Sequence, residues 1–182
     1  MRCLRGGEGS VEEHTDGLII RRARSDEAEA IWRLTRLAYA PYRGKIRPTF
    51  GALKVRLSTV RREIRTRSRI YGVGLLNGRI VATIRYRKRP RYLGLSRLAV
   101  HPDYQARGIG TAMLRWAEGE ALRCGVRELR GDVRAAMPHL LDFYRRLGYR
   151  PFARRSKRGY PGYLIAVKKK LRVGEDDAVP PG

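Results

Sequence analysis

The most informative segment of this 182-residue chain reads Leu98-Ala99-Val100-His101-Pro102-Asp103-Tyr104-Gln105-Ala106-Arg107-Gly108-Ile109-Gly110-Thr111-Ala112. The apolar residues before Pro102 predict a strand, and the apolar spacing after Gly110 predicts a helix that runs to Gly125. A turn that carries two glycines joins them. Such a strand–turn–helix unit brings several backbone N–H groups to the positive end of a helix, and that geometry binds phosphate or pyrophosphate.

A second informative segment lies about thirty residues downstream and reads Leu141-Asp142-Phe143-Tyr144-Arg145-Arg146-Leu147-Gly148-Tyr149. It predicts a helix that starts near Pro138, carries Tyr144 and ends at Gly148. A Gly-x-Gly pair alone is a weak signal, because glycines this close often only make a turn. The two segments in this order and at this spacing are far more specific.

Together the segments resemble the two sequence markers of the GCN5-related N-acetyltransferase (GNAT) family. The first marker is Gln105-x-Arg107-Gly108-Ile109-Gly110-Thr111-Ala112, and the only Gln of the chain fills its Gln position. The resemblance is close over residues 95–149. Over residues 18–87 it rests on the order of strands and helices alone.

This resemblance implies that acetyl-CoA is the co-substrate of an N-acetyltransferase. The strand before the turn would offer backbone hydrogen bonds to the pantetheine arm, through Leu98, Ala99 and Val100. The amides of the turn and helix start would surround the pyrophosphate, and they belong to Gln105, Ala106, Arg107, Gly108, Ile109, Gly110 and Thr111.

The resemblance also places Tyr144 near the CoA sulfur, as the general acid that protonates the departing thiolate. A phenol with an ordinary pKa of about 10 stays protonated at neutral pH. Helical periodicity alone favours a core aromatic at this position, whereas the glycine turn favours the acid. No Cys or Ser lies in a recognisable nucleophile setting, so the sequence favours direct transfer to the amine over an acyl-enzyme.

The chain departs from the family pattern in two places. Met137 stands where many members have an Asn that bonds to the cofactor. A Glu often serves as general base on the central strands, yet this chain has no acid between Ile64 and Pro102. The base is therefore not identified, and the nearest acids are expected to be exposed or ion-paired: Glu63, Asp103, Glu128 and Asp132. The three histidines lack metal-ligand spacing, so no metal is expected.

The remaining pattern predicts an α/β (α+β) fold, with a mixed, mostly antiparallel sheet of about six to seven strands flanked by about four helices. Strands are expected at 18–22, 71–75, 80–86, 92–100, 127–133, 149–155 and 163–167. Helices are expected at 26–38, 53–64, 109–125 and 138–147. The Asn77-Gly78 pair predicts a hairpin, and residues 40–52 predict a loop.

One domain is expected over residues 17–172, between a mobile N-terminal tail (1–16) and a mobile acidic C-terminal tail (173–182). No stretch reaches the length of a membrane helix, and no secretory signal is present at the start, so a cytoplasmic location is expected. Cys3 and Cys124 are expected to be free thiols. The oligomeric state is expected to be a monomer or a homodimer.

The chain is strongly basic, with a formal net charge of +24. Residues 17–172 hold 39 Lys and Arg against 10 Asp and Glu, a net charge of +29. Such a field attracts polyanions, including CoA and nucleic acid, and repels polycations. One rival interpretation is therefore a nucleic-acid- or ribosome-associated binding module, and another is an inactive acetyl-CoA sensor.

The acceptor is expected to be a primary amine of a small molecule or a protein. By the resemblance, it would lie against two segments that combine aromatic and cationic residues, 39–50 and 154–163. If these segments line the site, an acceptor with negative charge is favoured over a polycationic aminoglycoside. The alternative is that both segments are solvated loops.

Overall fold

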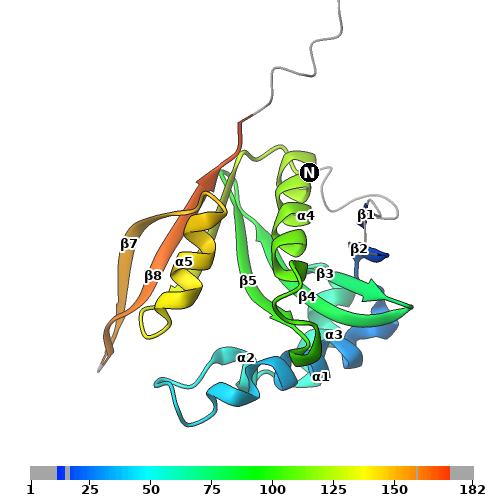
Figure 1. The fold of residues 1–182 in the computed structure, drawn as a ribbon, viewed down its shortest axis with the longest axis horizontal. Helices are drawn as coiled ribbons and strands as arrows, with labels where there is room; N and C mark the ends of the chain where they lie inside the picture. The colour runs from blue at the N-terminus through cyan, green and yellow to red at the C-terminus, as the bar shows by residue number, and fades with distance from the viewer. Residues whose placement is uncertain (1–11, 15–16, 159, 173–182) are drawn as a thin grey trace, which may run out of the picture.

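The computed structural model describes residues 12–14, 17–158 and 160–172 (Figure 1). Its strands are β1 (Glu12–His14), β2 (Leu18–Arg22), β3 (Ile70–Leu76), β4 (Arg79–Lys88), β5 (Leu93–Val100), β6 (Glu128–Arg134), β7 (Arg150–Lys157) and β8 (Tyr160–Lys170). Its α-helices are α1 (Ala28–Tyr39), α2 (Gly51–Lys54), α3 (Leu57–Arg65), α4 (Ile109–Arg123) and α5 (Pro138–Arg146).

The strands form one mixed sheet in the order β1-β2-β3-β4-β5-β6-β8-β7, and only the β5–β6 pair is parallel. The predicted mixed, mostly antiparallel sheet is thus confirmed. The sheet has eight strands because it includes β1, which lies in the segment predicted as an N-terminal tail and pairs with β2. The other residues of the two predicted tails, 1–11, 15–16 and 173–182, lie outside the described part of the chain.

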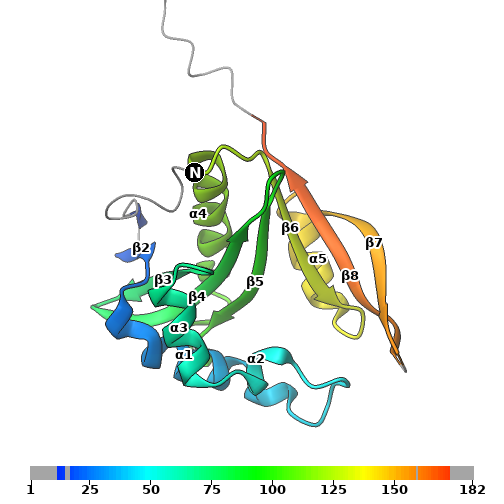
Figure 2. The same ribbon diagram turned by 180° about the vertical axis from the view of Figure 1, so that it is seen from behind.

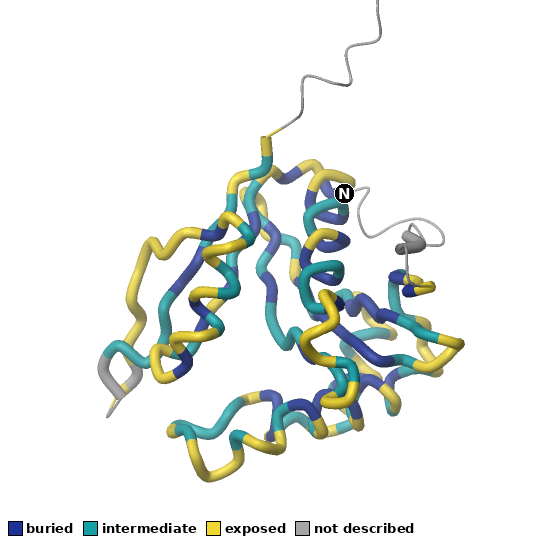
Figure 3. Tube along the Cα trace, in the orientation of Figure 1, coloured by how far each residue is buried: buried dark blue, intermediate teal, exposed yellow. Residues whose placement is uncertain are grey.

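Helices cover both faces of the sheet. Figure 1 shows α4 and α5 on one face, and the view from behind in Figure 2 shows α1 and α3 on the other. On the α4 face, the fully buried Met113 and Trp116 pack into the larger core cluster together with Tyr86 of β4. On the opposite face, Ile31 and Val60 pack with strand β3. The buried segments in Figure 3 accordingly follow the central strands and the inner sides of the helices.

Strands β5 and β6 touch at one end only. Their ladder consists of two pairs, Leu93–Leu129 and Gly94–Arg130. Beyond these pairs, a β-bulge interrupts the β4–β5 ladder, and Arg97 lies in the left-handed region with φ of 54°. A bulge bends its strand, so β5 follows β4 while β6 follows β8, and the two diverge (Figure 2).

Three further sequence predictions need correction. Residues 40–52 were predicted as a loop, but a 3-10 helix at Ala40–Tyr42 and the first residues of α2 lie within them. The apolar spacing from Leu53 to Ile64 predicts one helix, but Val55 and Arg56 are extended and separate the single turn of α2 from α3. Cys124 is disulfide-bonded, contrary to the predicted free thiol, and Cys3 lies outside the described residues. The prediction gave Cys3 no fixed place because it assigned that residue to a tail.

None of the described helices combines the length and the apolar character that a bilayer span requires.

Candidate active site

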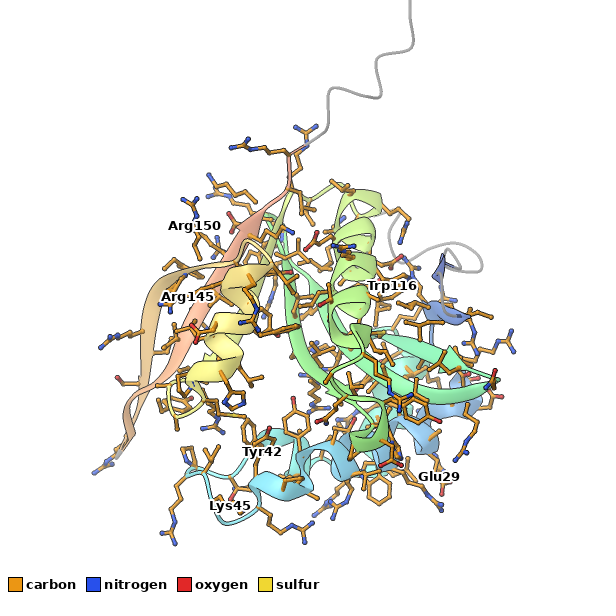
Figure 4. All side chains as sticks on the ribbon, in the orientation of Figure 1. Glu29, Tyr42, Lys45, Trp116, Arg145 and Arg150 are labelled. Atoms are coloured by element: carbon orange, nitrogen blue, oxygen red, sulfur yellow. The ribbon has the colours of Figure 1, made fainter. Side chains whose placement is uncertain are left out.

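A cleft of about 300 Å³ lies between β5 and β6, where the two strands diverge. Its walls come from both strands, from the end of α1 and the segment after it, and from α5. The residues that line it include Tyr39, Tyr42, Phe50, Arg97, Leu98, Asp132, Arg134, Met137 and Tyr144. Figure 4 places Tyr42 at the side of the gap formed by the α1 segment.

The glycine turn lies just beyond the end of β5, and most of its amides are free. In the described structure, the amides of Tyr104 and Gln105 are bonded within a turn, to the carbonyls of His101 at 2.9 Å and Pro102 at 3.2 Å. Among the described residues, the amides from Arg107 to Thr111 find no backbone acceptor, and the first bond of α4 is that of Ala112. Helix starts leave such donors open, so these amides can bind an anion.

Two residues of the turn adopt the left-handed conformation that opens it outward. Ala106 has φ of 60° and Gly108, the N-cap of α4, has φ of 77°. The side chain of Gln105 donates to the carbonyl of Val100 at 3.1 Å. The only glutamine of the chain therefore ties the turn back to β5, a role that the backbone prediction for Gln105 did not include.

The three strand residues predicted to bind the pantetheine arm differ in whether they face the cleft. Ala99 and Val100 pair with β4, and the carbonyl of Val100 also accepts from Gln105. Leu98 lines the cleft, and its carbonyl accepts a hydrogen bond from the hydroxyl of Tyr39 at 3.1 Å. Of the three predicted strand residues, Leu98 is therefore the one that faces the cleft.

Tyr144 of α5 and Tyr39 at the end of α1 both line the cleft. Figures 1 and 2 show these two helices on opposite faces of the sheet. Burial, with a smaller contribution from Tyr39, holds the pKa of Tyr144 well above its usual value of 10. Burial raises the pKa of Tyr39 to about 12. Both phenols are therefore protonated at neutral pH and can donate a proton.

The two sequence markers meet in space. A Cβ built on Gly110 would lie 3.6 Å from Cζ of Phe143, the neighbour of Tyr144. Met137 is 2% exposed at the N-cap of α5 and lines the cleft. The position of the missing Asn is thus an apolar wall, which offers no side-chain hydrogen bond.

Glu63 is bound in an ionic cluster beside the cleft and is not a free base. It accepts from the Tyr71 hydroxyl at 2.6 Å and pairs with Arg85 at 3.1 Å, while Arg97 lies 3.8 Å away. Burial opposes ionisation, but the hydrogen bond from Tyr71 and the two arginine charges lower the pKa of Glu63 below its ordinary value. The predicted ion pairing is confirmed for this residue.

Among the described residues, Asp132 is the one acid that lines the cleft. It is partly exposed and pairs with Arg155 at 3.3 Å. The other two acids named from the sequence lie elsewhere: Glu128 pairs with Arg130, and Asp103 lies near His101 in the turn after β5.

The aromatic residues of the predicted acceptor segment 39–50 line the cleft. Tyr39, Tyr42 and Phe50 pack in edge-to-face and tilted arrangements, with ring centroids 5.1 to 6.5 Å apart. Arg134, which the sequence did not single out, lines the same cleft from β6 with a guanidinium that stacks on Phe50. Arg134 could not be predicted, because its place depends on which strand faces the segment after α1.

The chain matches the family model "Acetyltransferase (GNAT) family" over residues 29–149. This chain belongs to the GNAT family. S-(2-succino)cysteine N-acetyltransferase of Bacillus subtilis is 35% identical to it over 155 residues, which cover 80% of this chain and 92% of the relative.

Solved structures of GNAT enzymes share the fold. PaiA N-acetyltransferase of Thermoplasma acidophilum in complex with coenzyme A superimposes with a TM-score of 0.69 at 19% identity, covering 85% of this chain and 99% of that one. Ribosomal-protein-S18-alanine N-acetyltransferase of Escherichia coli has the same TM-score and identity, covering 89% and 99%.

Membership of the GNAT family confirms the predicted class of activity. The chain is an acetyl-CoA-dependent N-acetyltransferase. The rival interpretations, a nucleic-acid-binding module and an inactive sensor, are not favoured.

Proposed function

We propose that this GNAT enzyme acetylates the primary amine of a small amino acid that carries carboxylates, by direct transfer from acetyl-CoA. The observation that carries the proposal is the cleft itself, which opens between β5 and β6 and has both Tyr144 and Arg134 in its lining. The Bacillus subtilis relative, named for S-(2-succino)cysteine, supports this acceptor class.

In the proposed reaction, the free amides from Arg107 to Thr111 hold the pyrophosphate of acetyl-CoA, and Leu98 offers its backbone to the pantetheine arm. Acetyl-CoA supplies the activated acetyl group. The amine nitrogen attacks the thioester carbonyl, a C–N bond forms and the C–S bond breaks. Tyr144 donates its phenolic proton to the departing sulfur.

The amine must lose a proton as it reacts, and the residues that line the cleft indicate which group accepts that proton. Glu63 lies in a cluster with two arginines and does not line the cleft, whereas Asp132 lines the cleft and pairs with a single exposed arginine, Arg155. We assign Asp132, with solvent, as the route by which the amine proton leaves. An α-amino group, with a pKa of about 8, gives up its proton more easily than a lysine side chain does.

The test is a thiol-release assay with purified protein, acetyl-CoA and S-(2-succino)cysteine, with the N-acetylated product identified by mass spectrometry. Turnover is expected with this acceptor and not with an acceptor whose amine is already acetylated. Absence of thiol release with S-(2-succino)cysteine and with other carboxylated amino acids would contradict the proposal. Cytoplasmic location, oligomeric state and nucleic-acid binding at the basic surface stay predictions from the sequence.

A further inference from the structure

Arg134 is a cation with no anionic partner in the described part of the chain. Its Nη1 atom is buried and finds no hydrogen-bond partner there. No described carboxylate forms an ion pair with it, and Tyr163 is the only ionisable group that affects its pKa. Its guanidinium stacks over Phe50 at 4.7 Å and over Tyr163 at 5.4 Å.

Arg130 provides the contrast within the same strand. It lies four residues before Arg134, on the same face of β6 because side chains alternate along a strand. It also stacks on aromatic rings, those of Tyr92 and Phe152. However, Arg130 is paired with Glu128 at 2.5 Å and does not line the cleft.

A buried guanidinium donor without a partner is unfavourable, because its lost hydration is not replaced. The rings of Phe50 and Tyr163 orient the Arg134 guanidinium, but no described acid pairs with it. The nearest acid along the strand, Asp132, is held by Arg155. An anion that enters the cleft would therefore supply the missing hydrogen bonds, and a carboxylate matches the planar guanidinium in a bidentate geometry.

We propose that Arg134 binds a carboxylate of the acceptor and so determines the specificity of the enzyme for anionic amines. This inference rests on the proposed function and adds the residue that selects the substrate. Phe50 and Tyr163 come from the two segments that the sequence predicted as acceptor-binding, so Arg134 lies where those segments converge. Asp132, one strand period away, faces the same cleft and suits the amine end of the acceptor.

The experiment compares Arg134→Gln with Arg130→Gln as the matched control. Each is assayed with S-(2-succino)cysteine and with 2-(ethylthio)ethylamine, which keeps the amine and thioether but has no carboxylate. For Arg134→Gln, kcat/KM on the carboxylated probe should fall about 10- to 100-fold, the effect of losing a hydrogen bond to a charged group. Its kcat/KM on the probe without carboxylates and its KM for acetyl-CoA should stay unchanged.

Binding of S-(2-succino)cysteine measured by calorimetry gives a readout that is independent of turnover. The affinity should weaken by the same factor in Arg134→Gln, recover partly in Arg134→Lys and stay unchanged in Arg130→Gln. Equal turnover of both probes by the wild type would overturn the inference while leaving the proposed function intact. A rise in the KM for acetyl-CoA would instead assign Arg134 to a CoA phosphate, and undiminished binding in Arg134→Gln would also overturn the inference.

Discussion

Two tyrosines in and just after α5 differ in what their hydroxyl groups face. The rings of Tyr144 and Tyr149 pack edge to face with centroids 5.3 Å apart. The hydroxyl of Tyr149 is buried and finds no partner among the described residues, and Tyr149 does not line the cleft, whereas Tyr144 does. The pair therefore separates the chemical role of a phenol from its packing role.

Tyr144→Phe should lower kcat by about 10²- to 10⁴-fold, the usual contribution of a general acid, with little change in the KM for acetyl-CoA. Tyr149→Phe should leave kcat unchanged, and it removes an unsatisfied hydroxyl, so stability should not fall. Steady-state thiol release and thermal unfolding of both variants check this. Wild-type kcat in Tyr144→Phe would exclude the residue as the acid.

The pH profile offers a second readout of the same residue. Because burial raises the pKa of Tyr144 above 10, the phenol remains protonated throughout the neutral and mildly alkaline range. No loss of kcat from its ionisation is therefore expected below about pH 10.

Single residues show where reasoning from sequence stops. The turn at Gly108 and the tyrosine at 144 belong to contiguous motifs, so the sequence predicts them. The sequence gives no reason to single out Arg134, which is one of 41 Lys and Arg residues. Whether an acid lies next to Arg134 depends on which strands neighbour β6, and the sequence does not specify these neighbours.

Helix α4 begins and ends at glycines in the same conformation. Gly108 has φ of 77° and Gly125 has φ of 71°, and a Cβ built on either would meet no atom within 4 Å. Replacement by alanine therefore costs backbone strain at both ends and causes no clash at either. The cost is about 1 kcal/mol in each case.

Gly108→Ala and Gly125→Ala should accordingly lower the free energy of unfolding by similar amounts. Only Gly108→Ala should also raise the KM for acetyl-CoA. The increase should be about fivefold if the whole strain energy of about 1 kcal/mol is lost from the binding free energy of acetyl-CoA at the turn amides. The KM for the acceptor should stay unchanged in both. Equal KM values for acetyl-CoA in the two variants would show that the turn does not hold the cofactor.

At the scale of elements, patterns with strong local signals were predicted well. The hairpin around Asn77-Gly78 and the strand over residues 18–22 match β3, β4 and β2. The break between α2 and α3 was missed, because apolar spacing continues across the two extended residues. The bulge at Arg97 was missed too, since a positive φ at arginine reflects the surrounding sheet and no local preference.

The whole molecule consists of two groups of strands that join at one point. β1 to β5 form one group, β6 to β8 form the other, and two ladder pairs connect them directly. Helix α4 packs against strands of both groups, including β4, β5 and β6. The sequence predicts the element order, but the divergence that creates the cleft follows from the bulge and so was not foreseen.

A ligand that lies between β5 and β6 should stabilise both groups at once. At a concentration of acetyl-CoA 100 times its Kd, the free energy of unfolding should rise by about 2.7 kcal/mol, which corresponds to a Tm increase of about 5 to 10 °C for a chain of this size. Hydrogen exchange should slow in β5, in the turn from Arg107 to Thr111 and in β6. Adenosine diphosphate, which offers the pyrophosphate without the pantetheine arm, should protect the turn alone. Protection by acetyl-CoA confined to the turn would mean that the thioester does not enter the cleft, and the site would have to be sought elsewhere on the basic surface.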